Sequence, residues 1–372
     1  MIMLDRVTHR LRSSRRLAIS LQQHLDGAAD WLAQAQDVSA DDGVPAYYNA
    51  KTKRWAASYP ETTGYIIPTL YRYAKLSGRA EFAERATRMA HWESSIQLPD
   101  GAVRAGTMDA DKIVPTIFNT GQVLFGWAAA WEETGAERFR QSLVQAADWL
   151  LSAQDNDGAW RNFASPYALD GVNTYNTRVA FGLARTAQAL DDERYAQAAK
   201  TNVDWALTQV RANGWLDNND LQDNHRPLTH TIAYAIRGIL EVGMLTDTPR
   251  FVSMAEKMAD SVASAQRRDG ALPGRLDMHW RAATRWSCLT GNAQMAIVWQ
   301  RLAALDGKPK WRDHARRCMD FTRATQNLAA SDIACRGGIA GSWPRSGEYM
   351  RWRYPNWAAK FFMDALMPEV YD

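Results

Sequence analysis

The chain has 372 residues, 46% of them hydrophobic, and its 44 lysines and arginines nearly balance 41 aspartates and glutamates, for a net charge of +3. This length allows a large core, while the small and scattered positive charge, without any motif, argues against a nucleic-acid partner. No run approaches the roughly 20 apolar residues of a membrane-spanning helix, so we expect no membrane span.

The cysteines and the N-terminal charges bear on location. Cys288, Cys318 and Cys335 form no Cys-x-x-Cys pattern, and no His-x-x-x-His occurs, so the sequence predicts neither a metal site nor a cofactor. A small, odd number of cysteines is typical of a reducing compartment. The basic cluster at residues 6–16 is not followed by the apolar segment of a signal peptide. We therefore expect a cytoplasmic protein; the sequence leaves its oligomeric state open.

Six glutamines close helix-like, aromatic-rich stretches at nearly constant spacing. The gaps between them are 61, 57, 55, 57 and 60 residues. A period this regular along the chain indicates one array of equal units, and such arrays gather their variable loops on one face. The six are Gln36, Gln97, Gln154, Gln209, Gln266 and Gln326.

The repeating unit is clearest between residues 136 and 187. Residues 137–154 have apolar side chains at helical spacing with charges between them, which predicts an amphipathic helix with one wet face. Asp157-Gly158 then forms a turn. Residues 176–190 are small and apolar around most of the circumference, which predicts a helix buried on more than one side.

The same alternation along the chain predicts an all-α fold, an (α/α)6 toroid in which inner helices line a central cavity. One toroid domain over residues 1–372 accounts for the whole length. Outer helices are expected to begin near Arg16, Ala80, Ala136, Asp192, Pro249 and Pro309. Inner helices are expected to begin near Glu61, Asn119, Asn176, Thr229, Leu289 and Asn356. Thr or Asn at these inner starts is expected to cap the free N–H groups of the new helix.

Tryptophan is unusually frequent, with 16 residues, and falls into two groups. Those at matching positions of outer helices are expected to pack between helix layers: Trp31, Trp92, Trp149 and Trp205. Those in loops either stack on the apolar faces of sugar rings or pack the loops themselves; both interpretations stay open for Trp55, Trp160, Trp215, Trp280, Trp343 and Trp352.

Polar residues at the inner-helix starts are the best site candidates, because the entering loops of a toroid meet at one mouth and helix N-termini favour anions. Glu61 follows Pro60 in the first inner helix. It is either a general acid or base or an acid placed where a helix start favours it. Residues 169–178 enter the third inner helix and combine a carboxylate, two amides, a phenol and a guanidinium, which favours a site over a simple turn.

Two further helix entrances carry candidates. His230 occupies the repeat position of Asn119 and Asn176, and histidine shuttles protons near neutral pH, although a lone histidine is more often a satisfied core residue. The loop 341–357 interleaves arginines with aromatics, a combination suited to carboxylates and sugar rings; the alternative is a solvated loop fixed by aromatic packing. Cys288, before the fifth inner helix, is a weaker candidate for a nucleophile.

Several segments resemble known proteins. The six pairs, with Gln-Asp-Asn-Asp-Gly-Ala-Trp at 154–160, resemble the α/α toroid superfamily, which holds terpene cyclases, prenyltransferase subunits and many carbohydrate-active enzymes. Ser-Tyr-Pro-Glu-Thr-Thr-Gly-Tyr at 58–65, Leu-Thr-His-Thr-Ile-Ala-Tyr at 228–234, Cys-Leu-Thr-Gly at 288–291 and residues 354–362 look like a poorly characterised family encoded with bacterial exopolysaccharide biosynthesis genes. The resemblance covers nearly the whole chain and implies no residue roles.

Three functions follow as hypotheses. The first is a glycoside hydrolase that cleaves or trims a bacterial polysaccharide or oligosaccharide with two carboxylates, Glu61 and Asp170, and Asp109 in reserve. The second is a polysaccharide lyase or sugar epimerase acting on a uronic acid, with Tyr175 or His230 as base. The third is a non-catalytic glycan-binding partner in polysaccharide assembly.

In the second hypothesis, Asn176 and Arg178 would neutralise the uronate carboxylate. In all three, the glycan is expected to contact polar and aromatic residues near the mouth of the toroid. These residues are Tyr65, Asn119, Trp160, Asn173, Asn176, Arg178, Trp215, Tyr234, Tyr349, Arg351 and Asn356.

Overall fold

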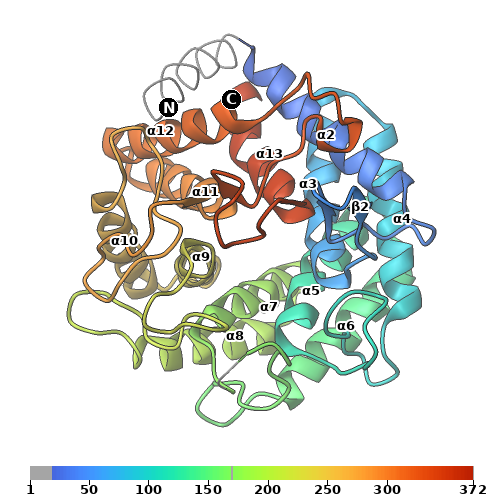
Figure 1. Ribbon diagram of the computed structural model, residues 1–372. Helices are drawn as coiled ribbons and strands as arrows, with labels where there is room; N and C mark the ends of the chain where they lie inside the picture. Colours follow the sequence, from blue (N-terminus) through green and yellow to red (C-terminus); the bar gives the residue numbers. More distant parts are fainter. Residues whose placement is uncertain (1–18, 169–170, 372) are drawn as a thin grey trace.

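The computed structural model describes residues 19–168 and 171–371, and within them twelve α-helices form two concentric rings (Figure 1). The basic cluster at 6–16 lies outside the described residues. The inner ring consists of α3 (Pro60–Ser77), α5 (Ile117–Thr134), α7 (Thr177–Leu190), α9 (Thr229–Leu245), α11 (Leu289–Asp306) and α13 (Asn356–Tyr371). The outer ring consists of α2 (Leu21–Asp37), α4 (Glu81–Ile96), α6 (Glu137–Ser152), α8 (Glu193–Leu207), α10 (Pro249–Ser264) and α12 (Pro309–Thr325). The predicted all-α toroid is confirmed.

Short turns and long loops alternate between the helices. A short turn joins each inner helix from α3 to α11 to the outer helix that follows, and the two pack as a hairpin. The sixth inner helix, α13, packs against α2 from the start of the chain, which closes the ring. The long loops lead from each outer helix to the next inner helix, so they gather at the N-terminal ends of the inner helices.

Residue pattern explains which helices are outer. Helix α6 buries Phe139, Leu143 and Leu150 and exposes charged side chains on its other face, as an amphipathic surface helix does. All of the first eleven residues of inner helix α11 are buried, because this helix contacts both ring neighbours and α12. The packing role predicted for the outer-helix tryptophans is confirmed, since Trp31, Trp92, Trp149 and Trp205 are all at most 8% exposed.

The periodic glutamines bind neighbouring units together. The side-chain amide of Gln154 donates to the Gly158 carbonyl in its own turn and to the Ala198 carbonyl on α8, both at 3.0 Å. Gln36, Gln97, Gln266 and Gln326 donate in the same two-sided way. Gln209 is the exception, because its amide donates to the adjacent Thr208 hydroxyl.

The glycine that follows such a glutamine is required by space as well as by backbone conformation. Gly158 has a φ of 94°, and a Cβ there would lie 2.3 Å from the Thr201 carbonyl oxygen of α8. Any other residue would push the turn away from the next outer helix. The Gln-turn-Gly pattern in the sequence therefore indicates where adjacent units contact each other.

The predicted caps at the inner-helix starts were wrong. The N-caps of α3, α5, α7, α9 and α11 make no side-chain cap hydrogen bond. The Thr63 and Thr120 hydroxyls instead accept from the Val44 and Val103 amides, at 3.0 and 2.9 Å. These side chains hold the incoming long loops against the inner ring.

The long loops also contain short strands, which the sequence pattern did not predict. Strands β1 (Tyr47–Asn49), β2 (Arg54–Trp55) and β5 (Arg353–Pro355) form a sheet in the order β2-β1-β5, and β3 (Ser287–Cys288) pairs with β4 (Ser342–Trp343). Two 3-10 turns, η1 (Thr174–Asn176) and η2 (Ile333–Cys335), complete the loops. The β1–β5 pairing joins the first and last long loops. Among the described helices, none is both long and apolar enough to cross a membrane.

Candidate active site

One carboxyl group lies among tyrosines and a histidine at the loop end of the inner ring. We call this group the tyrosine site; it consists of Tyr59, Glu61, Tyr65, Tyr175, His230, Tyr234 and Tyr349. Its members come from the start of α3, from η1, from the start of α9 and from the last long loop. The negative charge of Glu61 raises the pKa of all five tyrosines, although burial is the larger cause for each.

Glu61 is the titrating group of the site. Pro60, with its fixed φ, opens α3 and places Glu61 in the first turn. The carboxyl group is partly buried and accepts a hydrogen bond from the Tyr59 hydroxyl. Burial raises the pKa of Glu61 to about 7, against the opposing effect of the Tyr59 hydrogen bond. A carboxyl group with this pKa can donate or accept a proton at neutral pH.

His230 is positioned as a neutral base. Its Nδ1 lies 2.9 Å from the Oε1 of the buried Gln294. An amide oxygen only accepts, so Nδ1 carries the hydrogen and Nε2 keeps its lone pair. Burial lowers the pKa of His230 to about 4, and the charge of Arg178 contributes. His230 is therefore uncharged at neutral pH.

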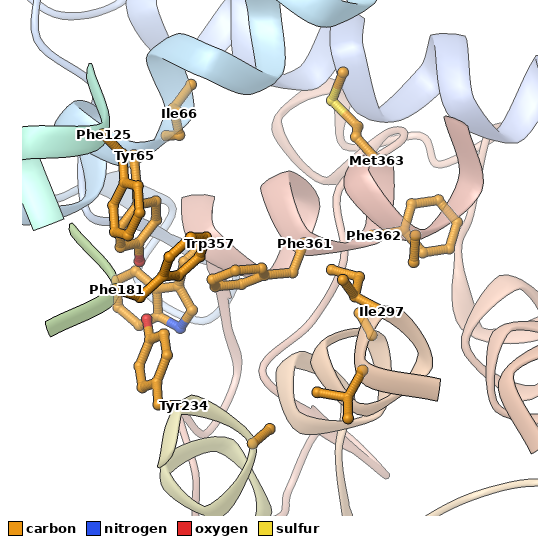
Figure 2. Packing of buried hydrophobic residues seen from close by; sticks show 14 of the residues in the cluster. Tyr65, Ile66, Phe125, Phe181, Tyr234, Ile297, Trp357, Phe361, Phe362 and Met363 are labelled. Carbon is orange, nitrogen blue, oxygen red and sulfur yellow. The ribbon is translucent and has the colours of Figure 1, made fainter. Parts of the chain in front are cut away.

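The tyrosines supply hydroxyl donors and apolar ring faces. The Tyr65 and Tyr234 side chains, on α3 and α9, point toward each other across the centre of the toroid (Figure 2). The His230 ring lies 4.5 Å from that of Tyr234 and 5.5 Å from that of Tyr349. Trp357 fixes Tyr349 by donating its indole N–H to the Tyr349 hydroxyl at 2.8 Å.

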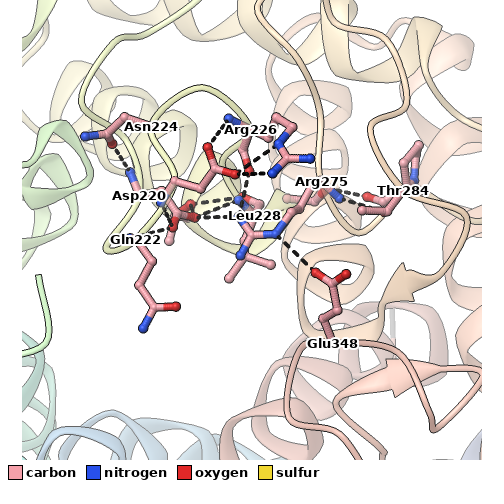
Figure 3. A network of polar contacts seen from close by, with 12 residues as sticks. Asp220, Gln222, Asn224, Arg226, Leu228, Arg275, Thr284 and Glu348 are labelled. Atoms are coloured by element: carbon pink, nitrogen blue, oxygen red, sulfur yellow. Dashed lines mark hydrogen bonds and ion pairs between the residues drawn. The ribbon is translucent and has the colours of Figure 1, made fainter. Parts of the chain in front are cut away.

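A buried aspartate holds the loop that delivers His230 (Figure 3). The Asp220 carboxylate accepts from the backbone N–H groups of Gln222, Asp223 and Leu228 at 2.9, 3.2 and 2.7 Å. It also lies 3.7 Å from the Arg275 guanidinium. Asp220 thus fixes residues 220–228 immediately before α9 begins at Thr229.

The structure brings together six of the residues that the sequence singled out: Glu61, Tyr65, Tyr175, His230, Tyr234 and Tyr349. Asn173 and Asn176 flank Tyr175 and are both buried. Asp170 lies outside the described residues. Asp109 is exposed and accepts from the Thr107 hydroxyl, and Arg351 is exposed on its loop.

Four residues expected to contact a glycan instead hold the fold. Asn119 donates to the Arg104 carbonyl at 2.8 Å and Asn356 to the Pro45 carbonyl at 3.0 Å, so both amides bind incoming loops. Trp160 and Trp215 are each 2% exposed. The Trp160 indole donates to the Leu150 carbonyl, and the Trp215 ring packs on Trp280, 5.1 Å away. Buried rings offer no face to a sugar.

Other residues emerge only from the structure. Tyr59 and Gln294, which hydrogen-bond to Glu61 and His230, carried no signal beyond the proximity of Tyr59 to Glu61 in the chain. Cys288 is fully buried, and burial raises the pKa of its thiol to about 12, which excludes a thiolate nucleophile near neutral pH. The Arg178 guanidinium lies 5.7 Å from the Tyr234 ring and lines a different cavity, described below.

Three solved structures with a similar fold are those of glycan-processing enzymes. An unsaturated glucuronyl hydrolase specific for heparin has a TM-score of 0.74 and 18% identity, over 93% of this chain and 95% of that chain. Cellobiose 2-epimerase from Bacillus thermoamylovorans has a TM-score of 0.73 and 9% identity, over 94% of this chain and 98% of that chain. A GH76 α-mannanase from Bacteroides thetaiotaomicron has a TM-score of 0.68 and 15% identity, over 95% of this chain and 97% of that chain.

The sequence itself gives no such match. Neither a protein-family model nor a curated protein sequence matches this chain. At 18% identity or less, the structural similarity concerns the arrangement of helices and does not transfer an activity. The chain has the α/α toroid fold that these three enzymes share.

Proposed function

We propose that this protein is a carbohydrate-active enzyme that uses Glu61 as a general acid on an oligosaccharide or polysaccharide. The observation that carries the proposal is the Glu61 carboxyl group, partly buried among tyrosines with a pKa raised to about 7. Aromatic ring faces suit the apolar C–H faces of sugars, and hydroxyl groups suit their oxygens. The shared fold of three glycan-processing enzymes supports the same class of substrate.

Hydrolysis of a glycosidic bond is the reaction that this geometry favours. The protonated Glu61 gives its proton to the leaving-group oxygen as the bond to the anomeric carbon breaks. His230, neutral with Nε2 unprotonated, takes a proton from the water that attacks that carbon. Within the described part of the tyrosine site, Glu61 has no second carboxylate beside it, so the base assigned here is a histidine.

Epimerisation or elimination at a uronic acid is the second candidate, and the same histidine favours it. A neutral imidazole with a free Nε2 can remove a proton from a carbon next to a carbonyl group, and Glu61 can return or donate one. The Arg178 guanidinium lies 5.7 Å from the Tyr234 ring and lines the cavity along the toroid axis, so hydroxyl groups are the donors proposed for a substrate carboxylate in the tyrosine site. Bacterial exopolysaccharide is the proposed polymer for either reaction, on the resemblance given above.

The experiment compares the wild type with Glu61→Gln on a panel of neutral and uronate-containing oligosaccharides and exopolysaccharides. The Glu61→Gln variant keeps the shape but loses the titrating proton, so activity should fall by at least about a hundredfold with binding little changed. Glu369→Gln is the control, because it makes the same substitution at an exposed glutamate near the C-terminal end of α13, far along the chain from the tyrosine site.

The products distinguish the candidates. New reducing ends without ultraviolet absorbance indicate hydrolysis, an unsaturated product indicates elimination, and isomerised sugar without cleavage indicates epimerisation. Saturable binding with no turnover would replace the proposal with a glycan-binding role. A fully active Glu61→Gln variant would show that Glu61 is only a helix-start residue.

A further inference from the structure

A cavity of about 420 Å³ lies along the axis of the toroid, away from the long loops. All six inner helices contribute to its wall, with residues that range from the first turn of α7, at Arg178, to the C-terminal end of α13, at Pro368. Tyr65 of the tyrosine site also lines this space, so the two sites adjoin, but neither Glu61 nor His230 is among its lining residues. The volume falls within the range of small-molecule sites. We call this space the basic cavity.

Positive charge dominates the wall. It carries six cationic side chains, Arg72, Arg178, Arg185, Arg237, Arg301 and Lys360, and two carboxylates, Glu241 and Asp364. Lys360 pairs with Asp364 at 2.6 Å and Arg301 with Glu241 at 3.0 Å. Arg185 pairs with Glu132, outside the wall. Within the described residues, Arg72 and Arg178 make no ion pair, so the cavity keeps an uncompensated positive charge.

Arg178 is the deepest of these unpaired cations. It is 2% exposed, and its Nε donates to the Gln122 Oε1 at 3.2 Å. Its Nη1 is buried without a hydrogen-bond partner in the described part of the chain. The guanidinium lies over the rings of Phe125 and Phe181, at 4.4 and 5.1 Å. These two rings line the cavity with it and fix the guanidinium in place.

The backbone does not account for this charge. Arg178 is the second residue of α7, where the helix dipole is positive and disfavours a cation. Three other inner helices carry glycine at the matching position: Gly64, Gly121 and Gly291. Burial, together with the charge of Arg237, lowers the pKa of Arg178 to about 9. Because arginine keeps its proton in proteins, the Arg178 guanidinium stays charged in the folded protein although its surroundings disfavour the charge.

Neutralisation of helix C-termini does not explain the cations of the wall. Arg72 and Arg301 lie in the C-terminal halves of α3 and α11 but before the last turn, and the dipole favours a cation only within that turn. Arg178 lies in the first turn of α7, where the dipole has the opposite sign, whereas Lys360, the fifth residue of α13, already pairs with Asp364. The Arg178 charge therefore has no partner in the described wall, and an anion entering the cavity would supply one.

We infer that the basic cavity binds a small anionic ligand, a sugar-sized molecule or free ion that carries a carboxylate or phosphate. Arg178 and Arg237 would donate to its oxygens, since the buried Nη1 atoms of both lack partners among the described residues. Arginine suits these groups because its planar fork donates two parallel hydrogen bonds. Phe125 and Phe181 would pack beside the body of the ligand. The site does not depend on the activity proposed for Glu61.

Calorimetric titration of the full chain tests the inference with glucuronate, a hexose phosphate and inorganic phosphate, and with glucose as the uncharged control. At least one anion should bind saturably and glucose should not. The anion that binds shows whether the cavity takes a carboxylate, a sugar phosphate or free phosphate. The Arg178→Gln and Arg237→Gln variants should each weaken binding by at least about tenfold, as loss of a charged hydrogen bond does.

Two controls separate this site from others. Arg250→Gln, which removes an exposed arginine paired with Asp204, should leave binding unchanged, and so should Glu61→Gln. If Arg178→Gln does not fold, the test uses Arg237→Gln and Arg72→Gln, which should weaken anion binding in the same titration. Absence of binding by all three anions, equal binding of glucose, or full binding in the arginine variants would overturn the inference.

Discussion

Glu61 and His230 divide the work of proton transfer because burial shifts their pKa values in opposite senses. A carboxyl group becomes harder to ionise when buried and an imidazole becomes harder to protonate. With a pKa of about 7 for Glu61 and about 4 for His230, the acid stays protonated and the base stays neutral over the same pH interval.

This division predicts a bell-shaped pH dependence of activity. The value of kcat/KM should rise as the pH passes about 4, where His230 loses its proton, and fall as it passes about 7, where Glu61 does. Measuring kcat/KM from acid to mild alkali checks both limbs. A profile that keeps rising above neutral pH would show that ionised Glu61 is the working form, and hence a base.

The same pKa shift means that Glu61 lowers the stability of the folded protein at high pH. Its pKa is raised from 4.5 to about 7, so between these values the unfolded chain loses this proton while the folded chain keeps it, and stability falls as the pH rises through that window. Glu61→Gln should therefore be more stable than wild type at pH ~8, by roughly 2–3 kcal/mol, and similar at pH ~4. Denaturant unfolding at the two pH values measures this. Equal stability at both would mean that water reaches the carboxyl group freely.

At the scale of the element, the sequence predicts helices well and loop contacts poorly. Helical spacing identifies α6 and α11 as outer and inner, because burial on one side or on several leaves different patterns. Glu61 and His230 could be predicted together because both open inner helices. Asn119 and Trp160 could not be placed, since an amide that holds a loop and a buried loop tryptophan look the same in sequence as ligand-binding ones.

The loop before α9 gives a test of positioning. Asp220→Ala would leave three backbone N–H groups without their acceptor and would remove a carboxylate from beside Arg275. We expect the free energy of unfolding to fall by roughly 2–4 kcal/mol, and activity to fall because the loop that enters α9 at His230 loosens.

Asp217→Ala in the same loop is the control for that measurement. Its ion pair with Arg211 is solvent-exposed and should contribute less than about 1 kcal/mol. Chemical denaturation and kcat of the two variants make the comparison. Equal effects in both would mean that the loop is not anchored through Asp220.

For the whole molecule, the glutamine repeat predicts where the ring is held together. Gln326 donates to the Gly337 carbonyl and, across the closure, to the His24 carbonyl of α2. Its replacement by alanine removes both of these hydrogen bonds and the contact of Gln326 Oε1 with His24 Nδ1, so the melting temperature should drop with a loss of roughly 1–3 kcal/mol. Gln209→Ala removes the one of the six glutamines whose amide does not bridge two units; it donates to Thr208 and accepts from Asn218 at 3.5 Å, so stability should change by less than about 0.5 kcal/mol. Similar losses in both variants would contradict this view of the repeat.

The closure between α2 and α13 also fixes the order in which the chain can fold. Beside it, His24 of α2 contacts Gln326, the C-cap of α12, 302 positions away, and β5 pairs with β1 of the first long loop. During synthesis α2 emerges before α13, so the part of its apolar face that α13 covers stays open until α13 has been made. Contacts between residues this far apart in sequence form late in folding, because closing so long a loop costs chain entropy. A nascent chain of this protein therefore exposes this face of α2, with the hydrophobic surface that chaperones recognise, until α13 is complete.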